Sequence, residues 1–328
     1  MRRLATFLII LTMAGGVLVG VAPAVLAVAT TLTLSATPPT GNLGDQISLD
    51  GTLAFGDASP AEGEAIDLSR TEWDGSVTSL ADAVVEADGT FHVDDTPTKG
   101  GDLTYTAAFV AHDAFDGGVA TDTVDLQRPA SSVTASVSKQ IITFGDTITV
   151  TGHLGPSSDS DELTITATPV GGGEQELFTG DVNGNRNLQV THRPNRTTTY
   201  TVSFGGDGGH EASSAQATTQ VRVKVTARLV DFRSKQGKYR IYGRGGRAKM
   251  RIKVSPNHAG FSVNGYLEGY VNGSWTPFDS EAAPLSPSST QLFKAFGSSG
   301  VRWRMRAEMV GHADHLGNFS PWRYFRFA

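Results

Sequence analysis

Gly44-Asp45-Gln46-Ile47-Ser48-Leu49-Asp50-Gly51 returns 101 residues later as Gly145-Asp146-Thr147-Ile148-Thr149-Val150-Thr151-Gly152. A second stretch, Tyr105-Thr106-Ala107-Ala108-Phe109, returns 95 residues later as Tyr200-Thr201-Val202-Ser203-Phe204. A repeat of about 100 residues has the length of one domain. Because each copy alternates apolar and polar residues between turn-forming residues, the pattern predicts a repeated antiparallel β-domain.

The composition supports an all-β fold. The 328 residues include 38 glycines and 14 prolines, which suit many short strands joined by tight turns. The absence of cysteine excludes disulfides, thiol nucleophiles, cysteine zinc sites and iron–sulfur clusters. Each domain must therefore be stabilised by its own apolar core, which modules of about 100 residues can form.

The amino terminus has the features of a secretory leader. Met1-Arg2-Arg3 is positively charged, a long apolar stretch follows, and Val25-Leu26-Ala27 ends it with small residues. This pattern predicts a signal peptide over residues 1–27 with cleavage after Ala27. The alternative is a retained membrane anchor, because the apolar stretch is long enough to span a bilayer. We expect a secreted, extracellular protein, either free or associated with the cell wall.

Three modules follow the leader in this interpretation, at residues 28–128, 129–225 and 226–328. A proline-containing segment at 128–132 separates the first two modules. The second junction has no proline or glycine, and apolar residues alternate from Val221 to Leu229. We therefore expect one strand to run directly into the third module and the joint to be stiff.

The repeated motifs resemble a known family. In immunoglobulin-like (Ig-like) domains a tyrosine precedes the second cysteine by two residues, and Tyr105 and Tyr200 resemble it, with Ala107 and Val202 at the cysteine position. Trp303 stands at the equivalent place in the third module. The motifs resemble the disulfide-free Ig-like repeats of bacterial secreted and surface proteins, well over 29–223 and weakly over 224–328. The resemblance implies three tandem Ig-like β-sandwich modules used for adhesion, spacing or accessory binding, with no catalytic residue.

Charge is distributed unevenly along the chain. The formal charge is −15 over residues 29–128, −4 over 129–223 and +11 over 224–328, although the whole chain carries only −6. An acidic surface aids solubility, whereas a basic end favours contact with a polyanion or with an acidic partner.

The basic residues of the third module alternate with apolar ones on two predicted strands. Alternation places three cations of each strand on one face, and six cations would share that face if both strands belonged to one sheet. Lys238 and Arg240 would extend it. The alternative is an ordinary solvated face. The candidate polyanion-binding residues are Lys249, Arg251, Lys253, Arg302, Arg304 and Arg306.

The tryptophans of this module suggest a second kind of binding. Trp275 follows the Asn272-Gly273 turn, and an exposed indole there would form a platform for carbohydrate. Trp303 and Trp322 lie in alternating segments, where we expect them to pack into the core.

Evidence for catalysis or metal binding is weak. The segment from Gly260 to Gly265 approaches a nucleophile elbow at Ser262, but its surroundings are strand-like and the last glycine of the motif is Asn264. Loops after the sixth strand of each module carry potential metal ligands, namely His112, Asp113 and Asp116; Asp207, His210 and Glu211; and His312, Asp314 and His315. Their spacing varies and polar loops are common, so we predict no metal site, no cofactor and no enzymatic activity.

These observations together predict a secreted, non-enzymatic Ig-like repeat protein at the cell surface. Its basic third module would contact an anionic cell-envelope polymer or another protein, with no specific nucleic acid and with membrane contact only through an uncleaved leader. The alternatives are a carbohydrate-binding accessory or adhesion protein and an uncharacterised secreted hydrolase acting through Ser262 or through His312 with His315. The sequence leaves the ligand and the oligomeric state open.

Overall fold

The computed structural model describes residues 28–56, 59–112, 115–156 and 160–328. The predicted leader at residues 1–27 lies outside this range. All regular secondary structure in the described part of the chain is β, as predicted. No helix in these residues is long and apolar enough to cross a membrane.

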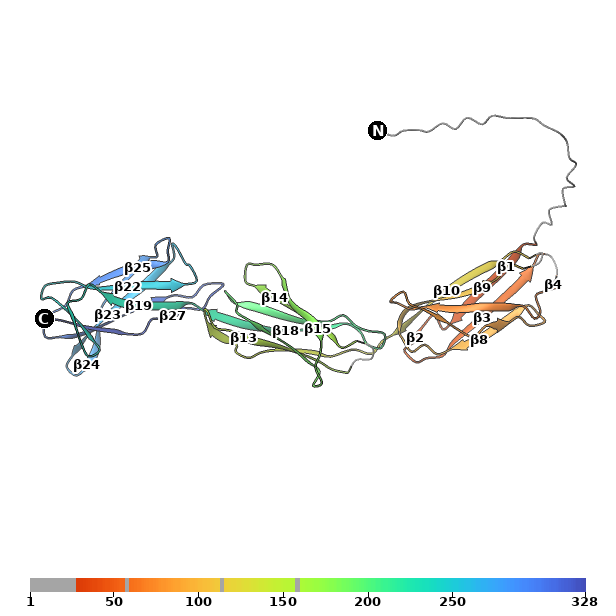
Figure 1. Cartoon of the computed structure of the whole chain (residues 1–328), viewed down its shortest axis with the longest axis horizontal. Helices are drawn as coiled ribbons and strands as arrows, with labels where there is room; N and C mark the ends of the chain where they lie inside the picture. The colour runs from red at the N-terminus through yellow and green to blue at the C-terminus, as the bar shows by residue number, and fades with distance from the viewer. Residues whose placement is uncertain (1–27, 57–58, 113–114, 157–159) are drawn as a thin grey trace, which may run out of the picture. The chain divides into compact units, whose positions relative to one another are not determined.

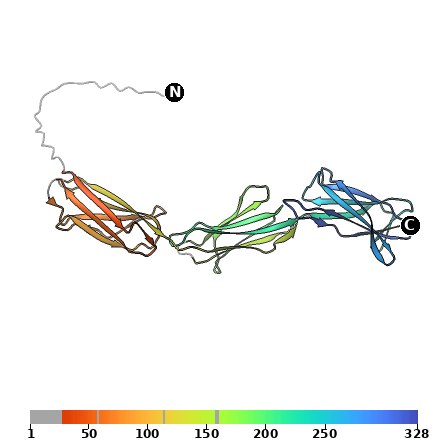
Figure 2. The ribbon, with the colours of Figure 1, turned by 180° about the vertical axis from the view of Figure 1, so that it is seen from behind.

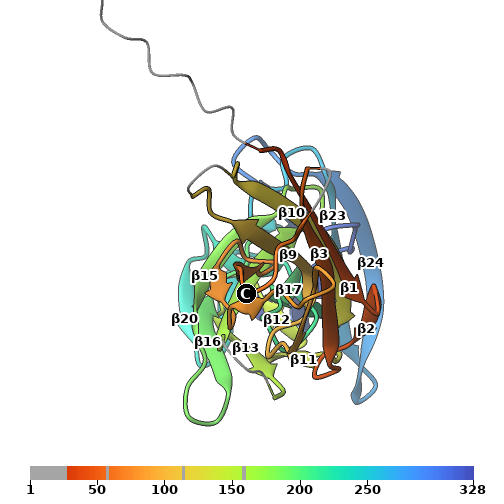
Figure 3. The same cartoon turned by 90° about the vertical axis from the view of Figure 1, so that its right-hand side faces the viewer.

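Residues 30–127 form the first module (Figure 1). Its strands are β1 (Thr30–Thr37), β2 (Thr40–Asn42), β3 (Ile47–Phe55), β4 (Ser59–Pro60), β5 (Ala65–Thr71), β6 (Val77–Ser79), β7 (Ala83–Val84), β8 (Thr90–Asp95), β9 (Gly101–Phe109) and β10 (Gly118–Gln127). One sheet has β3 paired with β1, β4 and β8, and the other runs β2-β10-β9-β5-β6, with β7 on β5. Figure 3 shows β1 beside β3, which pair antiparallel.

The second module has the same plan. Its strands are β11 (Val133–Val137), β12 (Ile141–Thr143), β13 (Ile148–Leu154), β14 (Glu162–Pro169), β15 (Gln175–Asp181), β16 (Asn187–His192), β17 (Thr198–Phe204) and β18 (Ser213–Arg222). The two sheets run β11-β13-β16 and β12-β18-β17-β14-β15.

The third module, coloured cyan to blue in Figure 2, repeats this topology, although its sequence is the least regular. Its strands are β19 (Lys224–Val230), β20 (Ser234–Gln236), β21 (Tyr239–Tyr242), β22 (Ala248–Ser255), β23 (Ser262–Val271), β24 (Ser274–Pro284), β25 (Thr290–Ala295), β26 (Arg302–Met309), β27 (Asn318–Phe319) and β28 (Arg323–Phe327). The sheets run β19-β22-β25 and β20-β21-β28-β26-β23-β24, with β27 on β26. The parallel pair β21–β28 matches β2–β10 and β12–β18. All three modules are therefore Ig-like β-sandwiches.

Period-2 alternation accounts for the three cores. β9, β17 and β26 each bury every second residue, and the repeated Tyr105 and Tyr200 are fully buried. Trp303 is 3% exposed at the equivalent position. Each of these side chains has a polar partner, as buried Tyr and Trp require: the Tyr105 hydroxyl donates to Asp95, the Tyr200 hydroxyl contacts His192 Nδ1, and Trp303 Nε1 donates to the carbonyl of Ser298.

The last glycine of the repeated motif has a packing role. A Cβ on Gly51 would lie 2.1 Å from the Phe91 ring, and one on Gly152 would lie 2.5 Å from Val202 Cγ1. Both contacts are far shorter than van der Waals distance. Gly51 therefore leaves room for the Phe91 ring of the neighbouring strand β8, and Gly152 lets Val202 of the opposite sheet approach β13.

The alternation at the second junction continues almost without a break. β18 ends at Arg222 and β19 begins at Lys224, with the buried Val223 between them. The Val223 amide donates to the carbonyl of Leu316, and the Leu316 amide donates to that of Val221. The junction is thus held by backbone hydrogen bonds from a loop of the third module.

Candidate functional site

The two cation-bearing strands of the third module belong to different sheets. β22 carries Lys249, Arg251 and Lys253 in the three-stranded sheet, whereas β26 carries Arg302, Arg304 and Arg306 in the seven-stranded one. The expectation that six cations share one face is therefore wrong. Alternation orders side chains within a strand but does not determine which sheet the strand joins.

The three-stranded sheet carries its own row of cations, which we call the basic sheet face. Arg228 of β19 lies opposite Arg251 of β22, and Lys249 of β22 lies opposite Lys294 of β25. Lys249 forms an ion pair with Asp231, with Nζ 2.8 Å from Oδ2, and this hydrogen bond lowers the pKa of the Asp231 carboxyl. The face consists of Lys224, Arg228, Lys249, Arg251, Lys253 and Lys294. Cations on adjacent strands lie about 5 Å apart, a spacing suited to a row of anionic groups.

The arginines of β26 are covered by aromatic rings, an arrangement we call the arginine–aromatic ladder. The guanidinium of Arg302 lies 3.6 Å from the ring centre of Tyr270, that of Arg304 4.1 Å from Trp322, and that of Arg306 4.5 Å from Trp322. The expected core position of Trp322 is thus wrong, because this residue precedes β28 and lies half-buried on the outer face.

Trp275 is a member of the same ladder. Its ring centre lies 5.2 Å from that of Tyr270 and 5.7 Å from that of Tyr324, and the Arg304 guanidinium stacks 4.6 Å above it. The ring is half-buried and contacted by these neighbours. The prediction of an exposed indole platform is therefore corrected: only part of the ring is accessible.

Carboxylates pair with polar side chains of the ladder. Arg304 forms an ion pair with Glu268, with Nε 2.7 Å from Oε2. The Tyr266 hydroxyl donates to Glu308, and this hydrogen bond raises the tyrosine's pKa. Cation–π stacking and ion pairing together leave Arg304 less available to a ligand than the cations of the basic sheet face.

A groove at the edge of the module gathers further cations. Its volume is about 700 Å³, and no Asp or Glu is among its lining residues. Lys238 lies 4.2 Å from the ring centre of Tyr324, and Arg240 lies 5.2 Å from that of Phe232. The cations of this groove are Arg228, Lys235, Lys238, Arg240 and Arg323.

Arg228 joins the groove to the basic sheet face. It is one of the groove's lining residues, and its strand β19 is an edge of the three-stranded sheet. Arg323 Nε donates to the Ala227 carbonyl at 2.7 Å, which holds β28 against the same edge. The candidate site is therefore a continuous surface made of the groove and the basic sheet face. Sequence reasoning named Lys238 and Arg240 but missed the groove, because it forms where two sheets meet.

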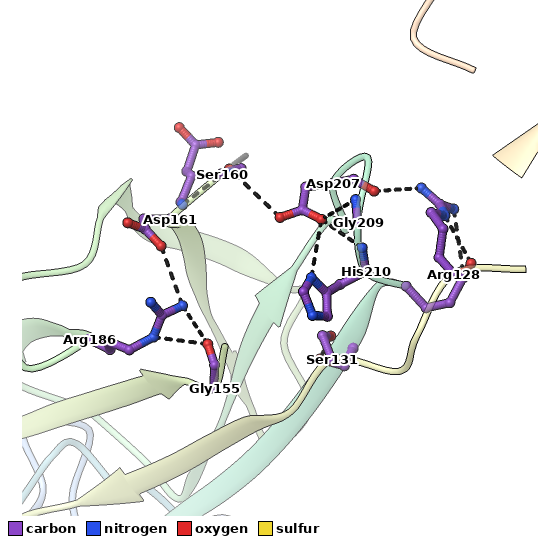
Figure 4. Close-up of polar contacts among 12 residues, drawn as sticks. Arg128, Ser131, Gly155, Ser160, Asp161, Arg186, Asp207, Gly209 and His210 are labelled. Carbon is purple, nitrogen blue, oxygen red and sulfur yellow. Dashed lines mark hydrogen bonds and ion pairs between the residues drawn. The ribbon is translucent and has the colours of Figure 1, made fainter. Parts of the chain in front are cut away.

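The three loops with potential metal ligands differ from one another. His112 contacts Glu64 at 2.8 Å, and Asp113 lies outside the described residues. Asp207 accepts hydrogen bonds from the amides of Gly209 and His210 and so stabilises a turn, as Figure 4 shows. In the third loop, by contrast, His312, Asp314 and His315 gather with His258 from another loop.

Ser262 does not have the setting of a nucleophile elbow. It is exposed at the first position of β23, and β23 continues as a strand to Val271. The elbow requires a strand that turns sharply into a helix, and no helix occurs among the residues that the structure describes.

No family model and no curated protein matches the sequence. Among solved structures, the chain is similar to a Salmonella alpha-2-macroglobulin reacted with methylamine (10% identity, TM-score 0.25), covering 92% of this chain and 23% of that one. It is also similar to murine CEACAM1b, with 13% identity and a TM-score of 0.28, over 58% of this chain and 100% of that one. A third similarity is to fibronectin(III)-like modules of Clostridium thermocellum CbhA, with 12% identity and a TM-score of 0.26, over 58% of this chain and 95% of that one. The chain thus spans about a quarter of the macroglobulin. These are distant similarities to β-sandwich domains.

Proposed function

We propose that this protein is a secreted, non-enzymatic Ig-like repeat protein whose third module binds an anionic polymer of the cell envelope. The observation that carries the proposal is the groove, in which five cations line a volume of about 700 Å³ together with Phe232, Trp322 and Tyr324 and without a carboxylate. Cations gathered at one site without neutralising acids attract a polymer that carries many negative charges.

The mixture of cations and aromatic rings favours an acidic polysaccharide. Lys and Arg pair with carboxylate, sulfate or phosphate groups, and aromatic rings offer apolar area to the faces of sugar rings. Because the basic sheet face continues from the groove through Arg228, an extended chain can contact both surfaces at once. Multiple weak contacts along one polymer then add to give useful affinity.

The two amino-terminal modules have a different role in this proposal. Residues 29–128 carry a charge of −15 and residues 129–223 a charge of −4. Like charges repel, so these modules do not compete for the polymer and act as a soluble spacer. The third module, at +11, supplies the attachment.

Retention on a dextran sulfate matrix tests the binding site. Arg228, Lys235 and Lys238 are exposed, so changing all three to Ser removes three groove cations without disturbing the core. We expect at least a tenfold loss of affinity at low salt. The matched control changes Lys139, Arg193 and Arg222 to Ser, which are exposed cations of the second module, and should bind like the parent protein.

Equal loss of affinity in the two triple variants would show that net charge alone determines binding and would contradict the proposal.

The carbohydrate alternative makes a different prediction, in which Trp275→Ala abolishes retention on a neutral polysaccharide and the groove variant does not. The hydrolase alternative requires turnover that is lost in Ser262→Ala.

A further inference from the structure

Four potential metal ligands meet at the junction of the second and third modules. His258 comes from the connection between β22 and β23, whereas His312, Asp314 and His315 come from the loop between β26 and β27. One ligand atom from each residue lies within 4.8 Å of those of the other three. The residues line a cavity of about 200 Å³ together with Asn195 and Arg196 of the second module.

Backbone carbonyls hold two of the imidazoles in a fixed orientation. His258 Nδ1 lies 2.8 Å from the carbonyl of Pro256, and His315 Nε2 lies 2.7 Å from that of Asn195. In the neutral ring, a nitrogen that donates to a carbonyl fixes the tautomer and leaves a lone pair on the other nitrogen. The free atoms are then His258 Nε2 and His315 Nδ1, the pattern seen in metal-binding histidines.

Two buried nitrogens in this cluster have no hydrogen-bond partner. His315 is 3% exposed, and its Nδ1, which lies 3.2 Å from Asp314 Oδ1, has no hydrogen-bond partner. His312 Nε2 is also buried and unsatisfied, while its Nδ1 lies 2.6 Å from Asp314 Oδ1. Buried polar atoms without partners destabilise a fold, and a cation would satisfy these atoms.

The three imidazole rings lie close together. The ring centres of His258 and His312 are 4.7 Å apart, and those of His258 and His315 are 4.9 Å apart. The only cation from the second module at this cavity, Arg196, directs its Nη1 to the carbonyl of Val170.

We propose that His258, His312, Asp314 and His315 bind one divalent transition-metal ion, with Zn²⁺ as the ion that suits this donor set best. Three imidazoles and one carboxylate complete a tetrahedral Zn²⁺ site with no open position, which is typical of a structural site. Ligand bonds of about 2.0–2.2 Å require the four side chains to close around the ion. This differs from the sequence-based expectation of no metal.

The ion would stabilise the junction between the two modules. All four ligands belong to the third module, but the carbonyl of Asn195 orients the ligand His315, and the amide of Thr197 donates to the carbonyl of Asp314. Both Asn195 and Thr197 lie between β16 and β17 of the second module. Metal bound to the cluster therefore reinforces the contacts that join the modules.

Metal titration of the tag-free protein tests the site. We expect one Zn²⁺ per chain by calorimetry and elemental analysis, and a tetrahedral visible spectrum with Co²⁺. His258→Gln and His312→Gln should each weaken Zn²⁺ binding about a hundredfold or more. The matched control is His153→Gln, an exposed histidine that contacts Asn187, and it should bind like the parent.

The proposal is overturned if the parent protein retains no Zn²⁺, if it shows only an octahedral Co²⁺ spectrum, or if both ligand variants bind like the control. The Co²⁺ spectrum of the parent decides the question even if a variant fails to fold. Hydrogen exchange tests the junction: Zn²⁺ should slow exchange at Thr197 and Leu316 in the parent and not in His258→Gln. Unchanged exchange would confine the ion to the third module.

Discussion

Gly152→Ala tests why the repeated motif ends in glycine. The new Cβ would lie 2.5 Å from Val202 Cγ1 and 3.2 Å from Leu163 Cδ1. Both neighbours are fully buried, so neither can move without displacing the core. Overpacking of this kind costs about 1–3 kcal/mol. At roughly 4–8 °C per kcal/mol for a module of this size, a loss of about 2 kcal/mol lowers Tm by about 8–16 °C.

The assay is differential scanning calorimetry with hydrogen exchange to locate the change. Amides of β13 and β17 should exchange faster in Gly152→Ala. The matched control is Gly184→Ala in the same module, because a Cβ at Gly184 meets no atom within 4 Å; its stability should change by less than about 0.5 kcal/mol. If the two variants had the same Tm, close packing of the sheets across Gly152 could not be the reason for the glycine.

Three further substitutions probe the first and third modules. Asp95→Asn removes the carboxylate that pairs with buried Arg70 and accepts a hydrogen bond from the Tyr105 hydroxyl. Chemical denaturation should show a free energy of unfolding that is lower by about 2–3 kcal/mol. A decrease of less than about 0.5 kcal/mol would argue against this network. In thermal unfolding, Trp303→Ala should lower the free energy of unfolding by about 3–5 kcal/mol, because the ring is buried. Trp322→Ala, on the outer face, should lower it by clearly less. The reverse order would contradict the assignment of the two rings.

The regular strands were predictable because their burial follows the period of the sequence. The repeated stretches from Tyr105 to Phe109 and from Tyr200 to Phe204 lie within β9 and β17. β15 was not predicted, because Gln175–Asp181 alternates weakly and no residue in it is fully buried. The short β2 and β12 were also missed, since three-residue strands carry too little pattern.

The candidate site was predicted only in part. Sequence identified the basic residues of β22 and β26, but sheet assignment depends on contacts between strands far apart in the chain, so the opposite positions of Arg251 and Arg304 were not foreseen. His258 lies 54 residues before His312 in the sequence. The fold brings the connection between β22 and β23, which carries His258, next to the loop between β26 and β27. No pattern in the sequence around His258 indicates this contact.

The salt dependence of polyphosphate binding by the leader-free, tag-free protein tests most directly whether the groove of the third module binds polyanions. The groove has five cations. With about 0.7 counterions released per contact on a flexible chain, the logarithm of the association constant should fall with the logarithm of salt with a slope of about −3.5. A fourfold increase in salt should then weaken binding about 100-fold. A slope near zero, or no binding at low salt, would contradict the proposed function.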